Sequence, residues 1–168
     1  MRKIISICLI LCLGLLCGCG TQDESAYTNP VRFYFPREDI DLYNQEEALD
    51  FEIREGASFA SKADLLQAYF MGPGSNDLYS PFPPEGEVLD YSISGTRIRV
   101  TLSQNYNQLI GLQLTMATSC LALTLLSCGD VSVVEINIPA ADGSVTRSFS
   151  LSRDNIVLTD SYVALPAE

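Results

Sequence analysis

The side chains whose types and spacing come closest to catalytic chemistry are two pairs of glutamates. Glu46-Glu47 and Glu85-x-Glu87 each bring two carboxylates near one another, as general acid–base chemistry and glycoside hydrolysis require. Nothing in the sequence marks either pair as buried or as flanking a cleft. Because glutamate is seldom buried without a partner, solvated charge is the favoured interpretation.

The remaining candidates are a serine, a lysine and a short run of oxygen ligands. Ser103 would need Lys62 as its base, because the chain has no histidine. Its hydroxyl is better explained as the N-cap of a helix. Asp39-x-Asp41-x-x-Asn44 has the oxygen ligands that calcium prefers, but it lacks the glycine turn and distal glutamate of a calcium loop. We therefore expect no enzyme, no cofactor and no metal site.

The first residues resemble a secretory signal. Arg2 and Lys3 precede an uncharged apolar run that ends at Leu16. This run is too short for a comfortable membrane span. We predict a signal peptide over residues 1–18. The alternative is an N-terminal helix that stays uncut, which would also tether the chain to a membrane.

The end of this signal, Leu16-Cys17-Gly18-Cys19, resembles the lipobox of bacterial lipoproteins. In that motif the chain is cut before a cysteine whose sulfur carries a diacylglycerol. The likeness implies cleavage between Gly18 and Cys19 and lipid on Cys19; Cys17 fits less well, because Leu16 would then precede the cut. Two acyl chains anchor a protein stably. We expect a lipid-anchored protein on the extracytoplasmic face of a bacterial cell membrane, with a flexible tether over residues 19–30.

Acidic residues dominate the exported part of the chain. The full sequence has 21 Asp and Glu against 10 Lys and Arg, a net charge of −11, which becomes −13 when Arg2 and Lys3 leave with the signal. Such a surface repels nucleic acid and anionic headgroups, so we expect neither as a direct partner.

The cysteines do not form a disulfide framework. Four of the six lie at or before Cys19. Cys120 and Cys128 are separated by about 12 Å of helical rise, whereas a disulfide needs Cα atoms within about 7 Å. We predict two free, mostly buried thiols.

Hydrophobic periodicity predicts six strands and two helices. In order, these are strands over 31–35 and 49–55, a helix from the Ser61 N-cap to Phe70, a hairpin of strands over 87–94 and 96–103, a helix over about 104–127, and strands over 131–139 and 145–152. The hairpin turn is placed at Ser94-Gly95-Thr96. The order favours the α+β class, with a single mixed, mostly antiparallel sheet of about five to six strands and both helices packed on one face.

The helix over 104–127 should be buried over most of its girth. Its small or polar side comprises Gln104, Gln108, Gly111, Thr115, Ser119 and Ala122. A membrane span is the alternative for this segment. It is less favoured because polar residues interrupt the segment and no Lys or Arg lies between Arg99 and Arg147 to set an orientation.

The Gly/Pro-rich stretch over 71–86 joins a predicted helix to a predicted hairpin, and neither of these could bury its apolar face by itself. We therefore interpret it as an ordered connection within one domain and not as a linker. The predicted single domain covers residues 31–160, and a C-terminal tail covers 161–168.

The ordered series of motifs resembles the GerMN domain, which is named after a bacterial spore-formation and germination lipoprotein. A helix ends in "YFMGP", "LYSPFPPEGEVLDYSISGTRIRVTLS" follows, and a long helix ends in "LTLLSCGDVSVVEINI". The matching points are Gly72-Pro73, Pro81 to Gly86, Ser103, Leu123 to Leu125, and Val131-x-x-Val134. The resemblance spans roughly Val31 to Leu151. It implies a non-enzymatic envelope domain whose fold is similar to ring-building motifs, which assemble side by side or dock on membrane partners.

These observations favour a membrane-anchored interaction or assembly module in sporulation, germination or envelope complexes. Its partners would be envelope or sporulation proteins, and self-association stays open. The small side of the long helix is one candidate docking face. The alternative is a lipoprotein that binds a small cell-wall fragment in an aromatic groove. The rings that would line this groove are Tyr69, Phe70, Tyr79, Phe82 and Tyr91.

The lipid anchor is tested by the intact mass of the protein purified from membranes. We expect a chain that begins at Cys19 and carries the mass of a diacylglycerol, because the lipobox directs both cleavage and lipidation. The Cys19→Ala protein should lack both changes. An unmodified and uncut N-terminus in the parent protein would contradict the prediction.

Overall fold

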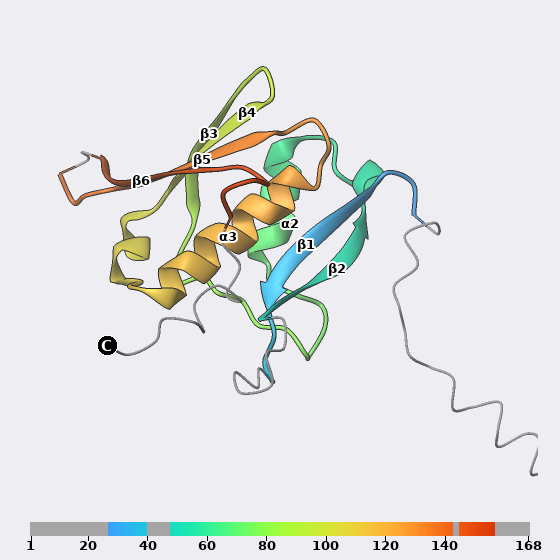
Figure 1. Cartoon of the computed structure of the whole chain (residues 1–168), viewed down its shortest axis with the longest axis horizontal. Helices are drawn as coiled ribbons and strands as arrows, with labels where there is room; N and C mark the ends of the chain where they lie inside the picture. Colours follow the sequence, from blue (N-terminus) through green and yellow to red (C-terminus); the bar gives the residue numbers. More distant parts are fainter. Residues whose placement is uncertain (1–26, 40–47, 143–144, 157–168) are drawn as a thin grey trace, which may run out of the picture.

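The described part of the chain contains two α-helices and six strands, which confirms the predicted α+β class (Figure 1). The computed structural model describes residues 27–39, 48–142 and 145–156. The elements in order are β1 (Pro30–Pro36), β2 (Leu49–Glu55), α2 (Lys62–Phe70), β3 (Val88–Ser94), β4 (Arg97–Leu102), α3 (Leu112–Leu126), β5 (Val133–Pro139) and β6 (Val145–Leu151). Short 3-10 helices occupy Gly56–Ser58 and Gln104–Gln108.

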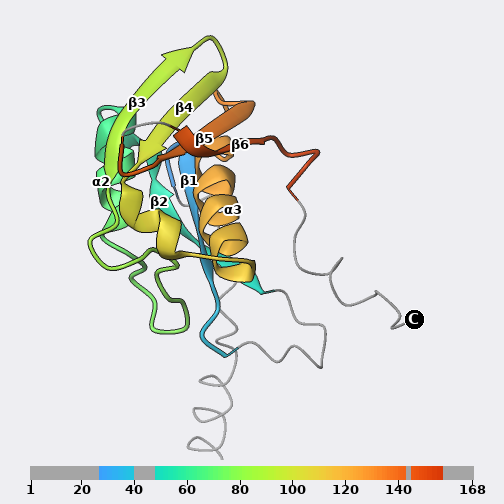
Figure 2. The ribbon, with the colours of Figure 1, turned by 90° about the vertical axis from the view of Figure 1, so that its left-hand side faces the viewer.

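The strands form two sheets, so the prediction of a single sheet is wrong on this point. β1 pairs with β2 in one antiparallel sheet. The other sheet has the order β3-β4-β5-β6, and β4 and β5 are its only parallel neighbours among the described strands. α3 is the crossover between them, and both helices lie on the same side of this mixed sheet (Figure 2). The chain divides into two sheets because the second edge of β1 faces α3 and not a third strand.

Side-chain hydroxyls hydrogen-bond this second edge of β1. The Tyr34 N–H donates to Thr124 Oγ1 in α3 at 2.9 Å, and the Arg32 N–H donates to Ser127 Oγ at 3.1 Å. The Ser127 hydroxyl also lies 3.1 Å from the Arg32 carbonyl oxygen, to which it can donate. The Tyr69 hydroxyl of α2 donates to the Tyr34 carbonyl at 2.8 Å. Buried backbone groups need partners, so the hydroxyls take the place of a neighbouring strand.

One cluster of buried side chains joins both sheets to both helices. Its members include Val31, Phe33 and Phe35 of β1, Leu65, Leu66 and Tyr69 of α2, Ile98, Val100 and Leu102 of β4, Cys120, Leu121, Leu125 and Leu126 of α3, and Val134, Ile136 and Ile138 of β5. Apolar burial of this extent is the main favourable contribution to folding. α3 is buried over most of its girth, as predicted, because it contacts β1 as well as the larger sheet.

Both ends of α2 are capped. The Ser61 hydroxyl accepts a hydrogen bond from the Asp64 N–H, which confirms the predicted N-cap. At the other end, the Arg54 guanidinium of β2 donates to the carbonyl oxygens of Ala68 and Gly72, both at 2.9 Å. A cation at a helix C-terminus is favoured by the helix dipole, so these bonds fix α2 against β2.

The long helix begins at Leu112, eight residues later than the predicted start near Gln104. Gly111 has a φ of +54°, a conformation that other residues rarely adopt, and the chain changes direction there. The predicted cap at Ser103 is also wrong. Its hydroxyl makes no cap hydrogen bond and instead accepts from the Glu87 N–H at 3.3 Å.

The small side of the long helix does not form one open face. Ser119 and Ala122 are buried inside the domain, so the docking face predicted there is wrong for these residues. Cys120 is buried and Cys128 is half-buried, and both thiols are free, which confirms the prediction. Among the residues described, we find no helix with both the length and the apolar character that a membrane crossing needs.

The Gly/Pro-rich connection between α2 and β3 is held against β1 and α2. Leu78 is buried and forms a bridge with Arg37, and the Tyr79 N–H donates to the Pro36 carbonyl at 3.0 Å. The Phe82 ring lies edge-on to Tyr69, with ring centroids 5.2 Å apart. The connection therefore has a fixed path across the end of the domain.

Replacing Thr124 by valine tests the hydroxyl contacts of β1. Thr124→Val keeps the side-chain shape but leaves the partly buried Tyr34 N–H without its acceptor, so we expect the free energy of unfolding to fall by about 1–3 kcal/mol. Thr115→Val in the same helix is the matched control, because Thr115 bonds only to the Gly111 carbonyl and should change stability by less than about 0.5 kcal/mol. Chemical denaturation measures both, and equal losses would contradict a special role for Thr124.

Candidate functional site

The structure does not bring together the residues that were considered and rejected as catalytic candidates. Ser103 bonds to the backbone of Glu87, whereas the Lys62 ammonium lies 2.8 Å from an oxygen of Asp130. The two residues therefore have different partners, and the Ser–Lys pair does not form. Glu85 and Glu87 are both exposed, as expected of solvated charge. Glu46 and Glu47 lie outside the described residues.

The proposed calcium ligands are only partly described. Asp39 accepts hydrogen bonds from the Arg37 guanidinium, the shorter at 3.2 Å. Asp41 and Asn44 lie outside the described residues, as do Gly18 and Cys19 of the lipobox. Over 27–39, 48–142 and 145–156, no three His, Cys, Asp or Glu side chains gather closely enough to hold a metal ion.

The five aromatic rings that the alternative function would place in one groove do not line one site. Tyr69 is fully buried and stacks on Phe35, with centroids 5.0 Å apart, so it belongs to the core. Phe70 and Phe82 lie against each other, with centroids 4.4 Å apart. Tyr79 and Phe82 line one recess of about 370 Å³, whereas Phe70 and Tyr91 line another. Most of these rings therefore serve packing.

A mainly apolar groove lies between α2 and the edge strand β3, and we call it the β3–α2 groove. Its volume is about 530 Å³. Its apolar lining is Ala63, Leu66, Phe70 and Met71 from α2 and its end, and Val88, Leu89 and Tyr91 from β3. Gly86, Gln67, Glu87 and Asp90 complete the wall. An open apolar groove of this kind is typical of a binding surface.

Large apolar side chains are exposed around this groove. The exposed fraction is 84% for Met71, 55% for Leu89 and 53% for Ile93, which lies further along β3. Leu89 is exposed because the pairing of β3 with β4 shifts between Val88 and Asp90. Met71 and Leu89 were not predicted as site residues. Two features of the sequence could have identified them. Met71 is an apolar residue just past the end of a helix, and Leu89 breaks the alternation of apolar and polar residues in a strand.

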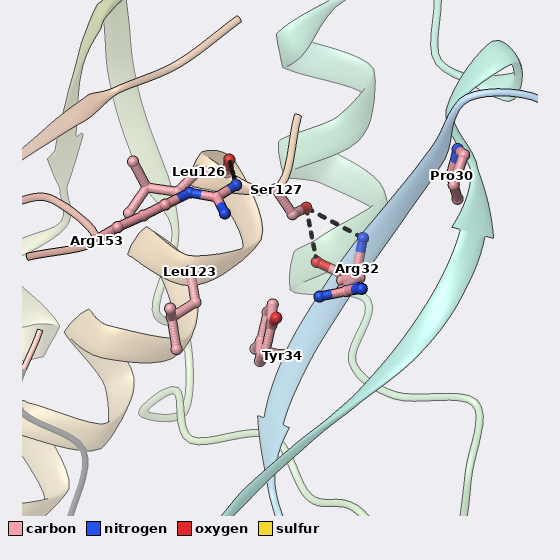
Figure 3. A pocket seen from close by; sticks show the side chains of 7 residues that line it. All are labelled: Pro30, Arg32, Tyr34, Leu123, Leu126, Ser127 and Arg153. Atoms are coloured by element: carbon pink, nitrogen blue, oxygen red, sulfur yellow. Dashed lines mark hydrogen bonds between the residues drawn. The ribbon is translucent and has the colours of Figure 1, made fainter. Parts of the chain in front are cut away.

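A third recess lies where the end of α3 meets β1 (Figure 3). It measures about 280 Å³ and is lined by Pro30, Arg32, Tyr34, Leu123, Leu126, Ser127 and Arg153. The Arg153 guanidinium donates to the Leu126 carbonyl at 2.9 Å, and the Arg32 guanidinium lies 4.9 Å from the centroid of the Phe51 ring. Ser127 is engaged with β1, as the dashed lines in Figure 3 show. The Ser127 contact joins the end of α3 to β1, the Arg153 contact joins α3 to the segment after β6, and the Arg32 contact joins β1 to β2. We therefore regard this recess as structural.

Lys62 and Asp130 form an ion pair beside a half-buried thiol. Burial raises the pKa of Cys128, and the nearby Lys62 ammonium opposes this rise. For Cys120, burial alone raises the pKa far above the usual thiol value. Since the thiolate is the reactive form, neither cysteine is prepared for nucleophilic catalysis.

Comparisons with known proteins found similarity at the level of structure. No model of a known protein family and no curated protein matches the chain. A structure of the tandem GerMN domains of the sporulation protein GerM from Bacillus subtilis matches with a TM-score of 0.49 and 19% identity, over 79% of this chain and 48% of that one. A crystal structure of a proposed lipoprotein from Clostridium perfringens matches with a TM-score of 0.46 and 13% identity, over 81% of this chain and 95% of that one. This chain therefore spans about half the length of the GerM structure, whose name contains the family that the sequence resembles.

Alkylation tests the electrostatics around Cys128. Lys62→Met removes the charge that opposes the rise in the thiol pKa, so iodoacetamide should modify Cys128 a few times more slowly at about pH 8.5. Lys62→Arg keeps the charge and should react like the parent protein. Peptide mapping by mass spectrometry resolves the two cysteines, and Cys120 should stay unmodified until the chain unfolds. Faster modification in Lys62→Met would mean that access controls the reaction, not charge.

Proposed function

We propose that the protein is a non-enzymatic interaction module, held by lipid on Cys19 at the extracytoplasmic face of the bacterial cell membrane. A single domain over residues 31–160 is carried on the tether over 19–30. It docks on other proteins of the envelope. The lipobox-like end of the signal supports the anchor, because two acyl chains hold a protein stably on a bilayer.

The observation that carries the docking role is the exposed apolar surface around the β3–α2 groove. Met71, Leu89 and Ile93 are among the most exposed large apolar side chains in the described part of the chain, and Met71 and Leu89 border the same groove. Soluble domains seldom leave large apolar side chains exposed around an apolar groove unless the surface binds something. A protein partner would bury this surface.

The roles of the polar residues support a module without catalytic function. Ser103 secures the start of β3, Lys62 pairs with Asp130, and Glu85 and Glu87 extend into solvent. Such residues stabilise the fold or keep it soluble. Function then depends on surface shape and charge, and not on a reacting group.

The resemblance of the sequence to GerMN domains favours partners in sporulation, germination or envelope complexes. We propose such proteins as the partners, and we do not propose a cell-wall fragment. A small-ligand site would need several aromatic rings around one cavity, and the rings here are divided between the core and two separate recesses.

Site-specific photo-cross-linking in native membranes tests the docking role. A benzophenone amino acid placed at Met71 or Leu89 should form covalent adducts with a partner, because both side chains border the proposed surface. The matched control is Ile110, which is 70% exposed but is not part of the groove lining. Mass spectrometry of the adducts identifies the partner.

Adducts at Met71 and Leu89 but not at Ile110 would support docking through this surface. Equal adducts at all three positions would indicate unspecific contact. Absence of any adduct in every growth phase, sporulation included, would contradict the interaction role.

A further inference from the structure

Among the residues that the structure describes, no strand pairs with the outer edge of β3. β3 is a terminal strand of the order β3-β4-β5-β6, and β4 covers only one of its edges. In an antiparallel strand pair, alternate residues direct their N–H and C=O groups away from the partner. Just before the strand begins, the backbone of Glu87 makes two hydrogen bonds to Ser103. Ser103 directly follows β4, so these bonds do not use the outer edge of β3.

Natural edge strands are protected by charged side chains, especially lysine, by proline, by bulges or by a covering element. On β3, Asp90 and the bulge before it lie in the first half of the strand, and among the described residues Tyr91 to Ser94 have none of these protections. β3 reads "VLDYSIS", without lysine or proline, and its one irregularity lies between Val88 and Asp90. The segment from Asp90 to Ser94 is regularly paired with β4, and no other described strand pairs with it. The corresponding edge of β1, by contrast, is covered by the hydroxyls of Thr124 and Ser127.

The groove beside this edge can take the side chains of an added strand. Successive side chains of a strand point to opposite faces of the sheet, so every second residue of a fifth strand would point toward α2. There it would meet Leu66, Phe70 and Met71 across about 530 Å³ of open volume. Apolar residues are favoured at these alternate positions because the α2 wall of the groove is mainly apolar.

The charges at the groove favour a basic occupant. Glu87 and Asp90 are exposed at its wall, and no Lys or Arg belongs to its lining. A second copy of this chain would bring the same carboxylates and another net charge of −11 against them, so electrostatic repulsion disfavours self-pairing. A segment with Lys or Arg between its apolar residues would have complementary charge.

We propose that β3 binds an extended segment of a partner protein as a fifth strand of its sheet. The segment is basic, and its apolar residues alternate along one face and enter the β3–α2 groove. Main-chain hydrogen bonds provide affinity in this mode of recognition, and the side-chain pockets provide specificity. This inference rests on the proposed function, since it specifies how the docking surface is used.

Synthetic peptides test the proposal on the full chain kept in solution with a mild detergent. The probe is a short peptide of alternating lysine and valine. Two controls are a peptide of the same composition with all lysines at one end and an alternating peptide of glutamate and valine. Fluorescence anisotropy gives the dissociation constants, and backbone amide exchange by NMR locates the bound strand.

We expect the alternating basic peptide to bind with protection of amides in Tyr91–Ser94, and both control peptides to bind at least about tenfold more weakly. Ile93→Lys introduces an edge-protecting charge and Asp90→Lys removes the complementary one, so each should weaken binding of the alternating peptide about tenfold. Ile110→Lys is the matched control and should bind like the parent protein. Circular dichroism and thermal unfolding confirm that these exposed substitutions leave the fold intact.

Three results would overturn the proposal. Equal binding of the two lysine peptides would show charge attraction without strand addition, and unchanged binding to Ile93→Lys would place the peptide elsewhere. A dimer in the parent chain that Ile93→Lys dissociates would identify a second copy as the occupant. If these peptides fail while Met71 and Leu89 still cross-link to a protein, strand addition is wrong and the docking role stands. Loss of both signals contradicts both proposals.

Discussion

Hydrogen bonds between the hydroxyls of α3 and the backbone of β1 are the contacts on which the rest of the arrangement depends. Thr124 and Ser127 lie about one helical turn apart, and Tyr34 and Arg32 are two residues apart on the strand. Because the spacing of the two hydroxyls along the helix matches the spacing of the two N–H groups along the strand, one side of the helix end can accept both hydrogen bonds. Because an orphaned buried N–H is costly, β1 can lie in the interior without a third strand only where these hydroxyls are present. The β1–β2 ribbon is thereby fixed to a helix and not added to the larger sheet.

This arrangement explains why α3 is buried on nearly all sides. One side of the helix contacts β1, and another contacts β5 and β6. α2 also holds the ribbon, because the Tyr69 hydroxyl donates to the Tyr34 carbonyl and the Arg54 guanidinium of β2 donates to the Ala68 carbonyl. α3 contacts β5 and β6, whereas α2 lies beside the outer strand β3 and lines a groove with it. The β3–α2 groove is therefore a consequence of how the helices are shared between two sheets.

Local patterns in the sequence were sufficient for most elements but not for the division into sheets. Alternation located β2 from Leu49 to Glu55, and the Ser61 cap located α2, because both signals act over a few neighbouring residues. Thr124 and Ser127, however, look like polar interruptions of an apolar helix, and their partners are 90 and 95 residues away. Gly111 likewise stands in an apolar stretch, and the sequence does not show that the long helix begins only after it. Its observed positive φ separates α3 from the preceding 3-10 helix. Single-sequence periodicity has no information on such long-range pairing, so the candidate groove, built from α2 and β3, could not be predicted either.

The distribution of charge connects the fold to the proposed recognition. Arg54 bonds with Glu52, Lys62 pairs with Asp130, and Arg97 and Arg99 share Glu135 on the outer face of the sheet. The few basic residues are thus occupied in holding elements together. The acidic excess is left to the surface, and at the β3–α2 groove it is represented by Glu87 and Asp90. Glu87 and Asp90 therefore stand at an apolar groove whose lining holds no Lys or Arg. A basic, partly apolar strand is the ligand that matches both features.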